Sequence, residues 1–258
     1  MVCMQERIDI LGVRIDTVRF DKLFNKTQTY LNEEAFHSIY FVGMKTVLAA
    51  ESNQEFVEQL EQCDFLIAAE RTIEEKIYGS RNYSSKERML MAARYLERIL
   101  IKMNKNKLNL YLIGNEQEQI EQLLKSLQQG YSDIQCYCSC IEEETKEEAM
   151  DFLVNDINVV APDVIILLMA GPQAMEFLRE NRSRINAKLC LCVGEAEEEV
   201  LKEIGIELEI PTWITYCHLE SLYRRIFHNY NVSNTILKKM FQKKMKQQQL
   251  KEEKEKKE

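Results

Sequence analysis

Short apolar runs alternate with amphipathic helical patterns along this chain, most clearly between Leu108 and Val193. There an apolar run ends at Gly114, a helical pattern follows, a second run arrives near Cys136, and the cycle repeats twice. Strand–helix–strand repetition implies parallel pairing with right-handed crossovers. The low number of breakers, 8 Gly and 3 Pro in 258 residues, agrees with many helices and short turns. The pattern predicts an α/β fold with a mainly parallel sheet flanked by helices.

The individual elements follow from the apolar period of each segment. Short apolar runs predict strands at Ile8–Ile10, Val13–Ile15, Ser38–Val42, Phe65–Ala68, Leu108–Ile113, Ile134–Cys138, Val164–Leu168 and Leu189–Val193. Amphipathic segments predict helices at Phe20–Leu31, Glu55–Gln62, Glu87–Met103, Glu116–Gln128, Glu143–Asn158 and Gln173–Arg184.

A small-residue turn follows one of these strands and is a candidate ligand loop. The stretch LLMAGPQAMEFLREN begins at Leu167 and passes from the apolar run into the helical pattern through Ala170, Gly171 and Pro172. Ligands of parallel α/β folds bind outside the carboxyl ends of the strands. Whether this turn binds a ligand depends on which polar groups surround it.

The net charge of −8 is unevenly distributed. From Arg224 to the end there are 11 Lys and Arg against 4 Asp and Glu, a net charge of +7, which leaves −15 on the rest of the chain. A basic tail can meet an anionic membrane surface or a nucleic acid, or it can be a solvated helix end. The acidic body argues against nucleic acid. Four residues of the tail, Leu237, Met240, Phe241 and Met245, have the spacing of one helical face, which could lie in a membrane interface or pack against a partner subunit.

The chain shows no export or membrane-spanning signal. No apolar run approaches the roughly 18 residues that span a bilayer. The early charges of MVCMQERIDI are not those of a secretory signal. Cys136, Cys138 and Cys140, like Cys190 and Cys192, are spaced by two, whereas zinc ribbons use C-x2-C. We therefore expect reduced cysteines in a cytoplasmic protein that needs no metal and no cofactor, with a Cys-rich metal site as the alternative.

Two segments carry a family resemblance. The opening IDILGVRID resembles the start of the WecG/TagA/CpsF glycosyltransferases, and PTWITYCHLESLYRR resembles their P-x-W-(M/I)-x4-L-E-x-L-Y-R signature. The middle agrees in spacing through YLIGN, APDVIILLMAGP and NRSRINAKLCLCVG, so that the resemblance covers roughly residues 7 to 230. The matching signature positions are Pro211, Trp213, Ile214, Leu219, Glu220, Leu222, Tyr223 and Arg224.

The resemblance implies a Rossmann-like core with a C-terminal helical appendage. It implies transfer of N-acetylmannosamine or a related sugar from a UDP-sugar to a lipid-linked acceptor, without a metal bound through D-x-D. The appendage of such enzymes helps them sit at the membrane. We accordingly expect a core at 1–205, a helical appendage at 206–235 and a basic, frayed or disordered tail at 236–258. Arg224, Arg225, Lys238 and Lys239 are expected on the acceptor or membrane side.

The position of the family's catalytic base is altered. In this family the proposed catalytic base is an aspartate in a P-D-G turn after a strand. Such a base removes the proton from the acceptor hydroxyl during transfer. The corresponding residues are Ala68, Ala69 and Glu70, so that alanine stands at the aspartate position. Glu70 is a weak surrogate from one position along. Its other interpretation is a helix N-terminal residue stabilised by the dipole.

The remaining ligand-binding positions of the family's motifs are also substituted. The T-x-N positions hold Phe41 and Gly43. The other motifs read Gly79-Ser80-Arg81 for G-S-D, Gly114-Asn115 for a glycine pair, Pro172-Gln173-Ala174-Met175 for P-K-Q-E, and Gly194-Glu195 for a second glycine pair. The candidate substrate-binding residues are therefore Gly43, Gly79, Gly114, Asn115, Gly171, Gln173, Gly194 and Glu195.

Two hypotheses follow from these losses. In the first, the chain is a degenerate glycosyltransferase that acts as a binding or scaffold subunit, with an active relative, another envelope enzyme or a second copy as partner. In the second, it is an active glycosyltransferase with altered donor, acceptor and catalytic residues. The second expects a working pocket for a UDP-sugar, whereas the first allows an empty one, so binding of a UDP-sugar distinguishes them. Both are compatible with a cytoplasmic location, peripheral on the inner face of the plasma membrane.

Overall fold

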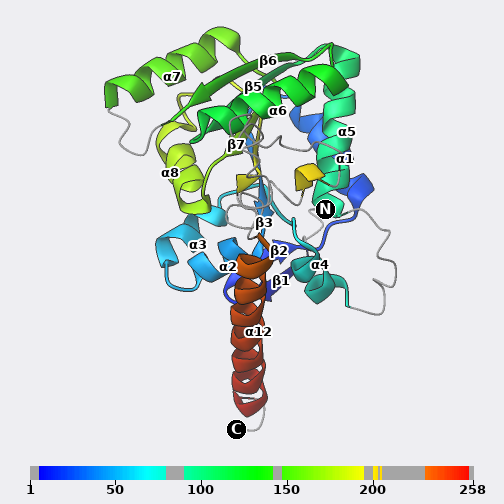
Figure 1. Ribbon diagram of the computed structural model, residues 1–258, viewed down its shortest axis with the longest axis vertical. Coiled ribbons are helices and arrows are strands. Elements are labelled where there is room, and N and C mark those ends of the chain that lie inside the picture. Colours follow the sequence, from blue (N-terminus) through cyan, green and yellow to red (C-terminus); the bar gives the residue numbers. More distant parts are fainter. Residues whose placement is uncertain are drawn as a thin grey trace, which may run out of the picture. The chain divides into compact units, whose positions relative to one another are not determined.

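The computed structural model describes residues 6–79, 90–141, 147–194, 200–202, 204 and 230–255. The chain divides into two compact units, Met1–Glu207 and Leu208–Glu258, which are described separately. Figure 1 shows their elements with the labels used below.

The first unit holds a six-stranded parallel sheet with the order β4-β3-β8-β7-β5-β6. Its strands are β3 (His37–Val42), β4 (Phe65–Ala68), β5 (Asn109–Gly114), β6 (Gln135–Cys140), β7 (Val164–Leu168) and β8 (Leu189–Cys192). All residues of β4, β7 and β8 are buried, as expected for parallel strands covered on both faces. The predicted α/β fold is confirmed.

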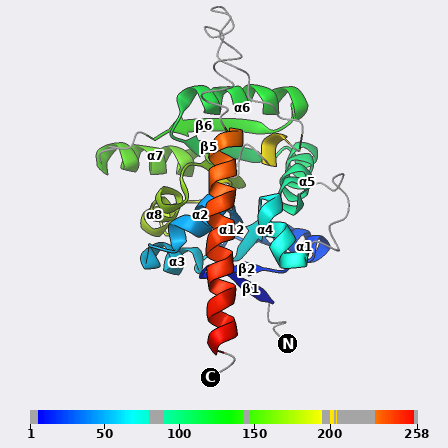
Figure 2. The same cartoon turned by 60° about the horizontal axis from the view of Figure 1, so that its bottom comes forward.

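The first unit contains eight helices in its described part. These are α1 (Phe20–Tyr30), α2 (Met44–Ala50), α3 (Gln54–Leu60), α4 (Arg71–Tyr78), α5 (Met91–Asn106), α6 (Gln117–Gly130), α7 (Glu147–Val160) and α8 (Gly171–Asn181). Helices α2, α3 and α8 lie on one side of the sheet and α1, α4 and α5 on the other (Figures 1 and 2). The short helices α2 and α4 were not predicted; the other six lie within a few residues of their predicted bounds.

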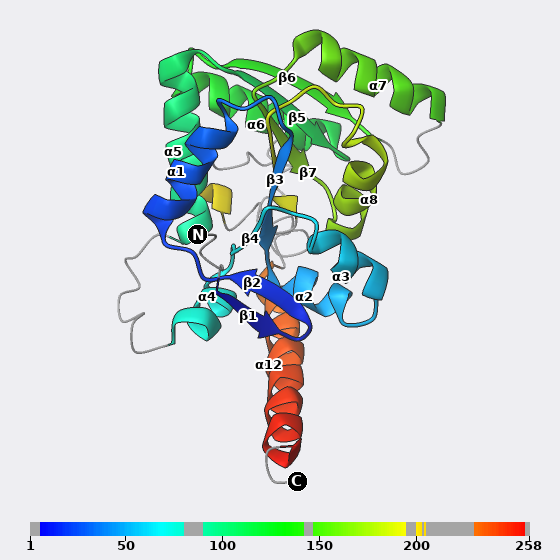
Figure 3. The same cartoon turned by 180° about the vertical axis from the view of Figure 1, so that it is seen from behind.

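A small antiparallel hairpin precedes the sheet. Strands β1 (Arg7–Ile10) and β2 (Val13–Asp16) are joined by Leu11 and Gly12, which both have positive φ, as a two-residue type I′ turn requires. The buried carboxylate of Asp16 accepts the N–H of Leu66 at 2.7 Å and the Nε–H of Arg7 at 2.9 Å. This carboxylate fixes the hairpin beside β4 (Figure 3).

Two aspartates stabilise the amino ends of neighbouring strands. Asp64, just before β4, accepts the N–H of Ser38 in β3 at 2.9 Å. Asp163, just before β7, accepts the N–H of Asn109 in β5 at 3.1 Å and pairs with Lys188 at 2.7 Å. Each carboxylate satisfies a backbone donor that the ladder leaves open, and so helps to set the strand register.

The second unit is described only as α12 (Tyr230–Glu255). The segment for which a frayed helix or disorder was expected is helical here as far as Glu255. The apolar side chains expected on one face differ in exposure: Phe241 is fully buried, whereas Met240 is 49% exposed. The predicted helix around Pro211 and the signature up to Arg224 lie outside the described residues.

No helix in the described part of the chain has the length and apolar character needed to cross a bilayer.

Candidate functional site

The carboxyl ends of the parallel strands form one edge, and most candidate residues stand along it. Gly43 follows β3, Glu70 follows β4, Gly194 follows β8, Gly171 begins α8 after β7, and Asn115 follows β5. Glu195, Ser80 and Arg81 lie outside the described residues, as do Arg224 and Arg225. Gly79 is the C-cap of α4, nine residues along the chain from Glu70.

Alanine at the end of β4 leaves a buried methyl group where the family resemblance places an acid. Ala69 is fully buried, and its N–H donates to the carbonyl of Val42 at 2.9 Å. Its backbone is therefore held against β3. The methyl group can neither accept nor donate a proton, so Ala69 has no acid–base role.

Glu70, the next residue, is the N-cap of α4 and is only 5% exposed. Its carboxylate lies against Gly43, which follows the adjacent strand β3. A Cβ built on Gly43 would come within 2.5 Å of Glu70 Oε1 and 3.2 Å of Cδ. Gly43 adopts an extended backbone that any residue can adopt, so a larger residue here is opposed by the Glu70 side chain and not by the backbone conformation. The absent side chain at Gly43 provides the volume that the carboxylate of Glu70 fills.

Phe41 takes part in core packing. It is 1% exposed, and its ring packs edge-on against Tyr95 of α5 at 6.3 Å between centroids. A side chain held in this way is directed into the layer between β3 and α5. Phe41 therefore offers no polar group to a ligand at the sheet edge.

Asn115 and Gln173 meet where the chain reverses direction in the sheet. From β5 the chain goes through α6 to β6 on one side, and from β7 it goes through α8 to β8 on the other. This is the type of switch point at which α/β folds open a ligand crevice. Here Asn115 Nδ2 donates to Gln173 Oε1 at 2.6 Å, and Asn115 Oδ1 is buried and has no hydrogen-bond partner among the described residues.

Glycines allow close packing around this switch point. A Cβ on Gly114 would lie 3.0 Å from the carbonyl oxygen of Leu168 in β7. A Cβ on Gly171 would lie 2.3 Å from the hydroxyl of Tyr40 and 2.9 Å from the ring of Phe56. Both glycines therefore serve packing between elements of the fold, independently of any ligand.

Gly194 is required by its backbone as well as by space. Its φ is +49°, and a Cβ there would lie 2.9 Å from the carbonyl oxygen of Met169. Glycine adopts this conformation at little cost. The chain leaving β8 thus turns tightly over the end of β7.

A second buried carboxylate stands one turn along α4 and was not predicted as functional. Glu74 is fully buried, and its Oε1 accepts the N–H of Met91 at 2.6 Å. Met91 begins α5, whose N-cap Leu90 offers no side-chain acceptor. Glu74 therefore caps α5 and fixes it to α4. The sequence signal that could have indicated its burial is an acid on the apolar face of a short amphipathic segment.

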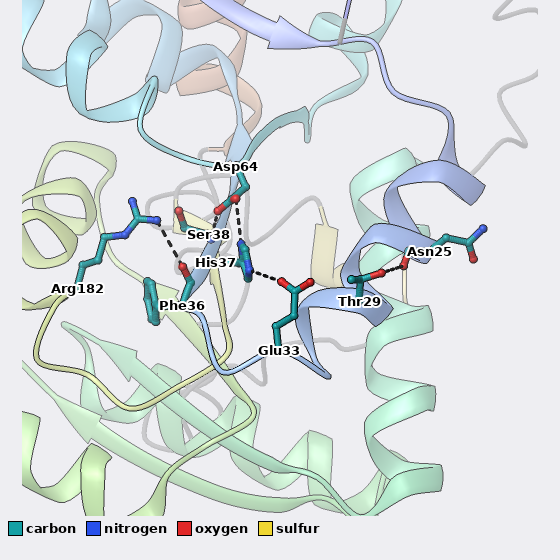
Figure 4. Close-up of polar contacts among 8 residues, drawn as sticks. All are labelled: Asn25, Thr29, Glu33, Phe36, His37, Ser38, Asp64 and Arg182. Carbon is teal, nitrogen blue, oxygen red and sulfur yellow. Dashed lines mark hydrogen bonds and ion pairs between the residues drawn. The ribbon is translucent and has the colours of Figure 1, made fainter. Parts of the chain in front are cut away.

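His37 lies at the opposite, amino edge of the sheet (Figure 4). Its Nδ1 is 3.0 Å from Asp64 Oδ1 and its Nε2 is 3.2 Å from Glu33 Oε2. Its ring stacks on Tyr30 with centroids 3.6 Å apart. Nearby, Arg182 donates to the carbonyl oxygens of Phe36 and Gln62. These contacts tie α1, α8 and the starts of β3 and β4 together, which is a structural role.

A small cavity lies near the amino edge. Its volume is about 50 Å³, enough for a water-sized group and too small for a nucleotide sugar. It is lined by Ser38, Gln59, Gln62, Cys63, Met175, Leu178, Arg179 and Arg182.

The six cysteines in the described part of the chain are buried or half-buried free thiols. Burial, foremost, raises the pKa of Cys63, and it raises the pKa of Cys136 to about 11. The contact with Cys190, followed by burial, raises the pKa of Cys192. Raised values disfavour the thiolate that binds metals or attacks substrates. Among the described residues, no three His, Cys, Asp or Glu side chains are placed to hold a metal ion.

Several lysines of α12 are exposed to solvent. Lys238 and Lys239 are exposed, as are Ile236 and Met240 at 55% and 49%. Basic and apolar side chains thus share the exposed surface of α12.

Comparison with known proteins supports one family. The model of the glycosyl transferase WecG/TagA/CpsF family matches residues 8–240. No curated protein matches the chain.

Proposed function

The chain belongs to the WecG/TagA/CpsF glycosyl transferase family, and from that premise we propose that it is a degenerate member that acts as a binding or scaffold subunit. The family transfers N-acetylmannosamine or a related sugar from a UDP-sugar to a lipid-linked acceptor. In this proposal the chain retains the fold and has lost that transfer. An active relative, another cell-envelope enzyme or a second copy is its partner.

The observation that carries the proposal is the end of β4. The expected aspartate position is Ala69, which is fully buried and bonded through its backbone to β3. General base catalysis needs a titratable group within hydrogen-bond reach of the acceptor hydroxyl. Typical losses of 10²–10⁴-fold accompany removal of such a group.

The donor side supports the same conclusion. Gln173 occupies the position of the lysine in the family's P-K-Q-E motif. Asn115 occupies the position of the second glycine in the pair after β5. These two side chains bond to each other across the crevice at 2.6 Å. A neutral amide pair provides none of the positive charge that stabilises a leaving diphosphate. Together with Ala69, these changes remove both the base for the acceptor hydroxyl and the positive charge for the leaving diphosphate.

One observation favours the second candidate, an active enzyme with altered residues. The carboxylate of Glu70 stands at the correct edge, beside Gly43. If the turn after β4 opened when an acceptor binds, Glu70 could accept its proton. In that candidate, Glu70→Gln abolishes transfer while the fold is preserved.

The basic tail supports a place at an anionic membrane surface. Lys238 and Lys239 are exposed on α12 beside apolar side chains. Each lysine near such a surface contributes about 1 kcal/mol of attraction. We propose peripheral attachment to the cytoplasmic face of the plasma membrane through this helix.

A transfer assay tests the proposal directly. The purified full chain is incubated with UDP-N-acetylhexosamine donors and a lipid-linked acceptor, and product is measured by mass spectrometry beside an active family member. We expect no product above background. Transfer that depends on Glu70, measured with Glu70→Gln and with the exposed control Glu75→Gln, would overturn the proposal in favour of the active enzyme.

A further inference from the structure

Strand β6 is the last strand at one edge of the parallel sheet (Figure 3). Gln135, at its start, donates its N–H to the carbonyl of Leu108, and Ile141, just past its end, donates to the carbonyl of Gly114. Backbone groups alternate between the two sides of a strand, so those of Cys136 and Cys138 point away from β5. They meet no other strand in the described part of the chain. This edge therefore offers donors and acceptors in the geometry that a further strand requires.

The strand lacks the features by which proteins protect an open sheet edge. Its sequence, QCYCSC, contains neither a charged residue nor a proline. Lysine, proline or an inward-pointing charge normally prevents pairing at such an edge. On a chain of net charge −8, this neutral strand is a place where a second acidic copy can approach without like charges lying opposite each other.

Exposed apolar side chains line the α7 side of this edge. The ring of Tyr137 is stacked on that of Tyr111 with centroids 6.4 Å apart, and Tyr137 is 39% exposed. The hydroxyl of Tyr111 donates to Asp156 of α7, so this side of α7 faces the two tyrosines. Phe152 and Val159 are four positions before and three positions after Asp156, which puts them on the same side of the helix. They are 74% and 85% exposed.

We infer that a second copy of the chain docks on this edge by antiparallel pairing of β6 with β6, about a two-fold axis at Tyr137. In this register Cys136 of each copy lies opposite Cys138 of the other, so the outward backbone groups of both residues are used. Tyr137 lies opposite its own counterpart in a non-hydrogen-bonded pair, with about 4.5 Å between the Cα atoms. Aromatic pairs across strands stabilise a sheet, and Phe152 and Val159 flank this pair. A two-fold interface is closed, so it joins two copies and no more.

The inference selects the second copy among the partners of the proposed function, and it rests on that proposal only for the expectation of a partner. A standard interface buries about 800 Å² on each side. An aromatic side chain buries about 150–250 Å², so the exposed parts of Tyr137 and Phe152 supply roughly 200 Å². This size is typical of a reversible dimer, and its population should depend on protein concentration.

Sedimentation velocity of the full chain over a hundredfold range of concentration tests the inference, and we expect a monomer–dimer equilibrium. Tyr137→Lys places two positive charges opposite each other across the axis and should weaken the dimer at least tenfold. Phe152→Lys, at a more exposed position on α7, should also weaken it, and it decides the outcome if the strand variant does not fold. Gln128→Lys, exposed near the end of α6, makes the same charge change and should leave the dimer unchanged. Circular dichroism confirms that each variant is folded.

Tyr137→Cys tests the register of the two strands. The expected Cα separation of about 4.5 Å across the axis lies within the range of about 4.4–6.8 Å found in disulfides. Oxidation in air should join two copies through residue 137, identified by tandem mass spectrometry of the linked peptide, whereas Gln128→Cys should stay unlinked in non-reducing electrophoresis.

Three results would overturn the inference. These are a chain that is monomeric at every concentration, a dimer that persists in both Tyr137→Lys and Phe152→Lys, and a dimer of the Tyr137→Cys variant that forms no link through residue 137. The transfer assay above reports independently on the proposed function, because dimerisation is measured without donor or acceptor.

Discussion

Glu70 Oε1 lies 2.5 Å from where the first side-chain atom of residue 43 would be, so the glycine after β3 and the acid after β4 fit as one unit. The two residues are 27 positions apart in sequence and become neighbours because β3 and β4 pair in parallel. Neither can be enlarged without moving the other.

Gly43→Ala is therefore expected to destabilise the fold by about 1–3 kcal/mol, the usual cost of overpacking a filled site. Its extended backbone accepts alanine, so the cost comes from the contact with Glu70. Combining Gly43→Ala with Glu70→Ala should relieve it, and a double-mutant cycle by urea unfolding measures the coupling. Gly130→Ala is the control, because no atom lies within 4 Å of its added Cβ. Additive single effects would mean that the two side chains do not compete for space.

The outline of the fold could be predicted because its strands are buried on both faces. The runs FLIA and VIILL are apolar throughout, and β4 and β7 have the predicted bounds. Helix α2, MKTVLAA, is too short at seven residues to show a helical period, and Gly43 gives no conventional side-chain cap signal. Helix α4 begins at an N-cap, Glu70, that makes no side-chain cap bond.

The contacts within the candidate site depend on strand order, which local periodicity does not report. Asn115 and Gln173 are 58 positions apart, and β6 lies between them in sequence. They meet only because β7 pairs with β5 on the side opposite to β6. The burial of Glu74 escaped prediction for a related reason: a carboxylate is normally a surface group unless a specific donor, here the N–H of Met91, meets it.

Removal of that carboxylate should loosen the junction of α4 and α5. Glu74→Ala leaves the Met91 N–H without its acceptor, at an expected cost of about 1–3 kcal/mol in the free energy of unfolding. Glu74→Gln keeps an acceptor oxygen and should cost less. Hydrogen exchange at the Met91 amide, which should accelerate in Glu74→Ala, is the local measurement. The exposed Glu75→Ala is the control, and equal exchange in both variants would show that Glu74 does not cap α5.

The half-buried thiol of Cys136 should destabilise the fold at high pH. Burial raises the pKa of Cys136 from 9.0 to about 11 in the folded chain. The folded state therefore holds this proton more tightly than the unfolded state, so the contribution to stability is complete below pH 9 and is lost as pH rises towards 11. Cys136→Ser should flatten the fall of the unfolding free energy between pH 9 and 11. An unchanged slope would mean that this thiol does not contribute.

Charge reversal on α12 should weaken attachment to anionic vesicles. Lys238→Glu with Lys239→Glu replaces two exposed cations, each worth about 1 kcal/mol near an anionic surface. Partitioning into phosphatidylserine-containing vesicles should fall at least tenfold, and neutral phosphatidylcholine vesicles should bind little of either protein. The Lys22 variant, Lys22→Glu with Lys105→Glu, reverses two exposed lysines of α1 and α5 and so controls for the change in net charge. Equal binding by the tail variant and the Lys22 variant would refute a specific role for α12.

Replacing Ala69 by aspartate tests whether the end of β4 alone accounts for lost transfer. The site is fully buried and next to Glu70, so Ala69→Asp places a second carboxylate in a confined space and should destabilise the fold by about 3 kcal/mol or more. Ala69→Asp with Glu70→Gly restores the family order and removes the neighbouring charge, and it should recover part of the stability. Neither variant is expected to transfer sugar, because Asn115 and Gln173 still close the crevice with neutral amides. Thermal unfolding and the transfer assay are measured on the same preparations. Transfer by the double variant would place the whole defect at Ala69 and leave the donor side competent.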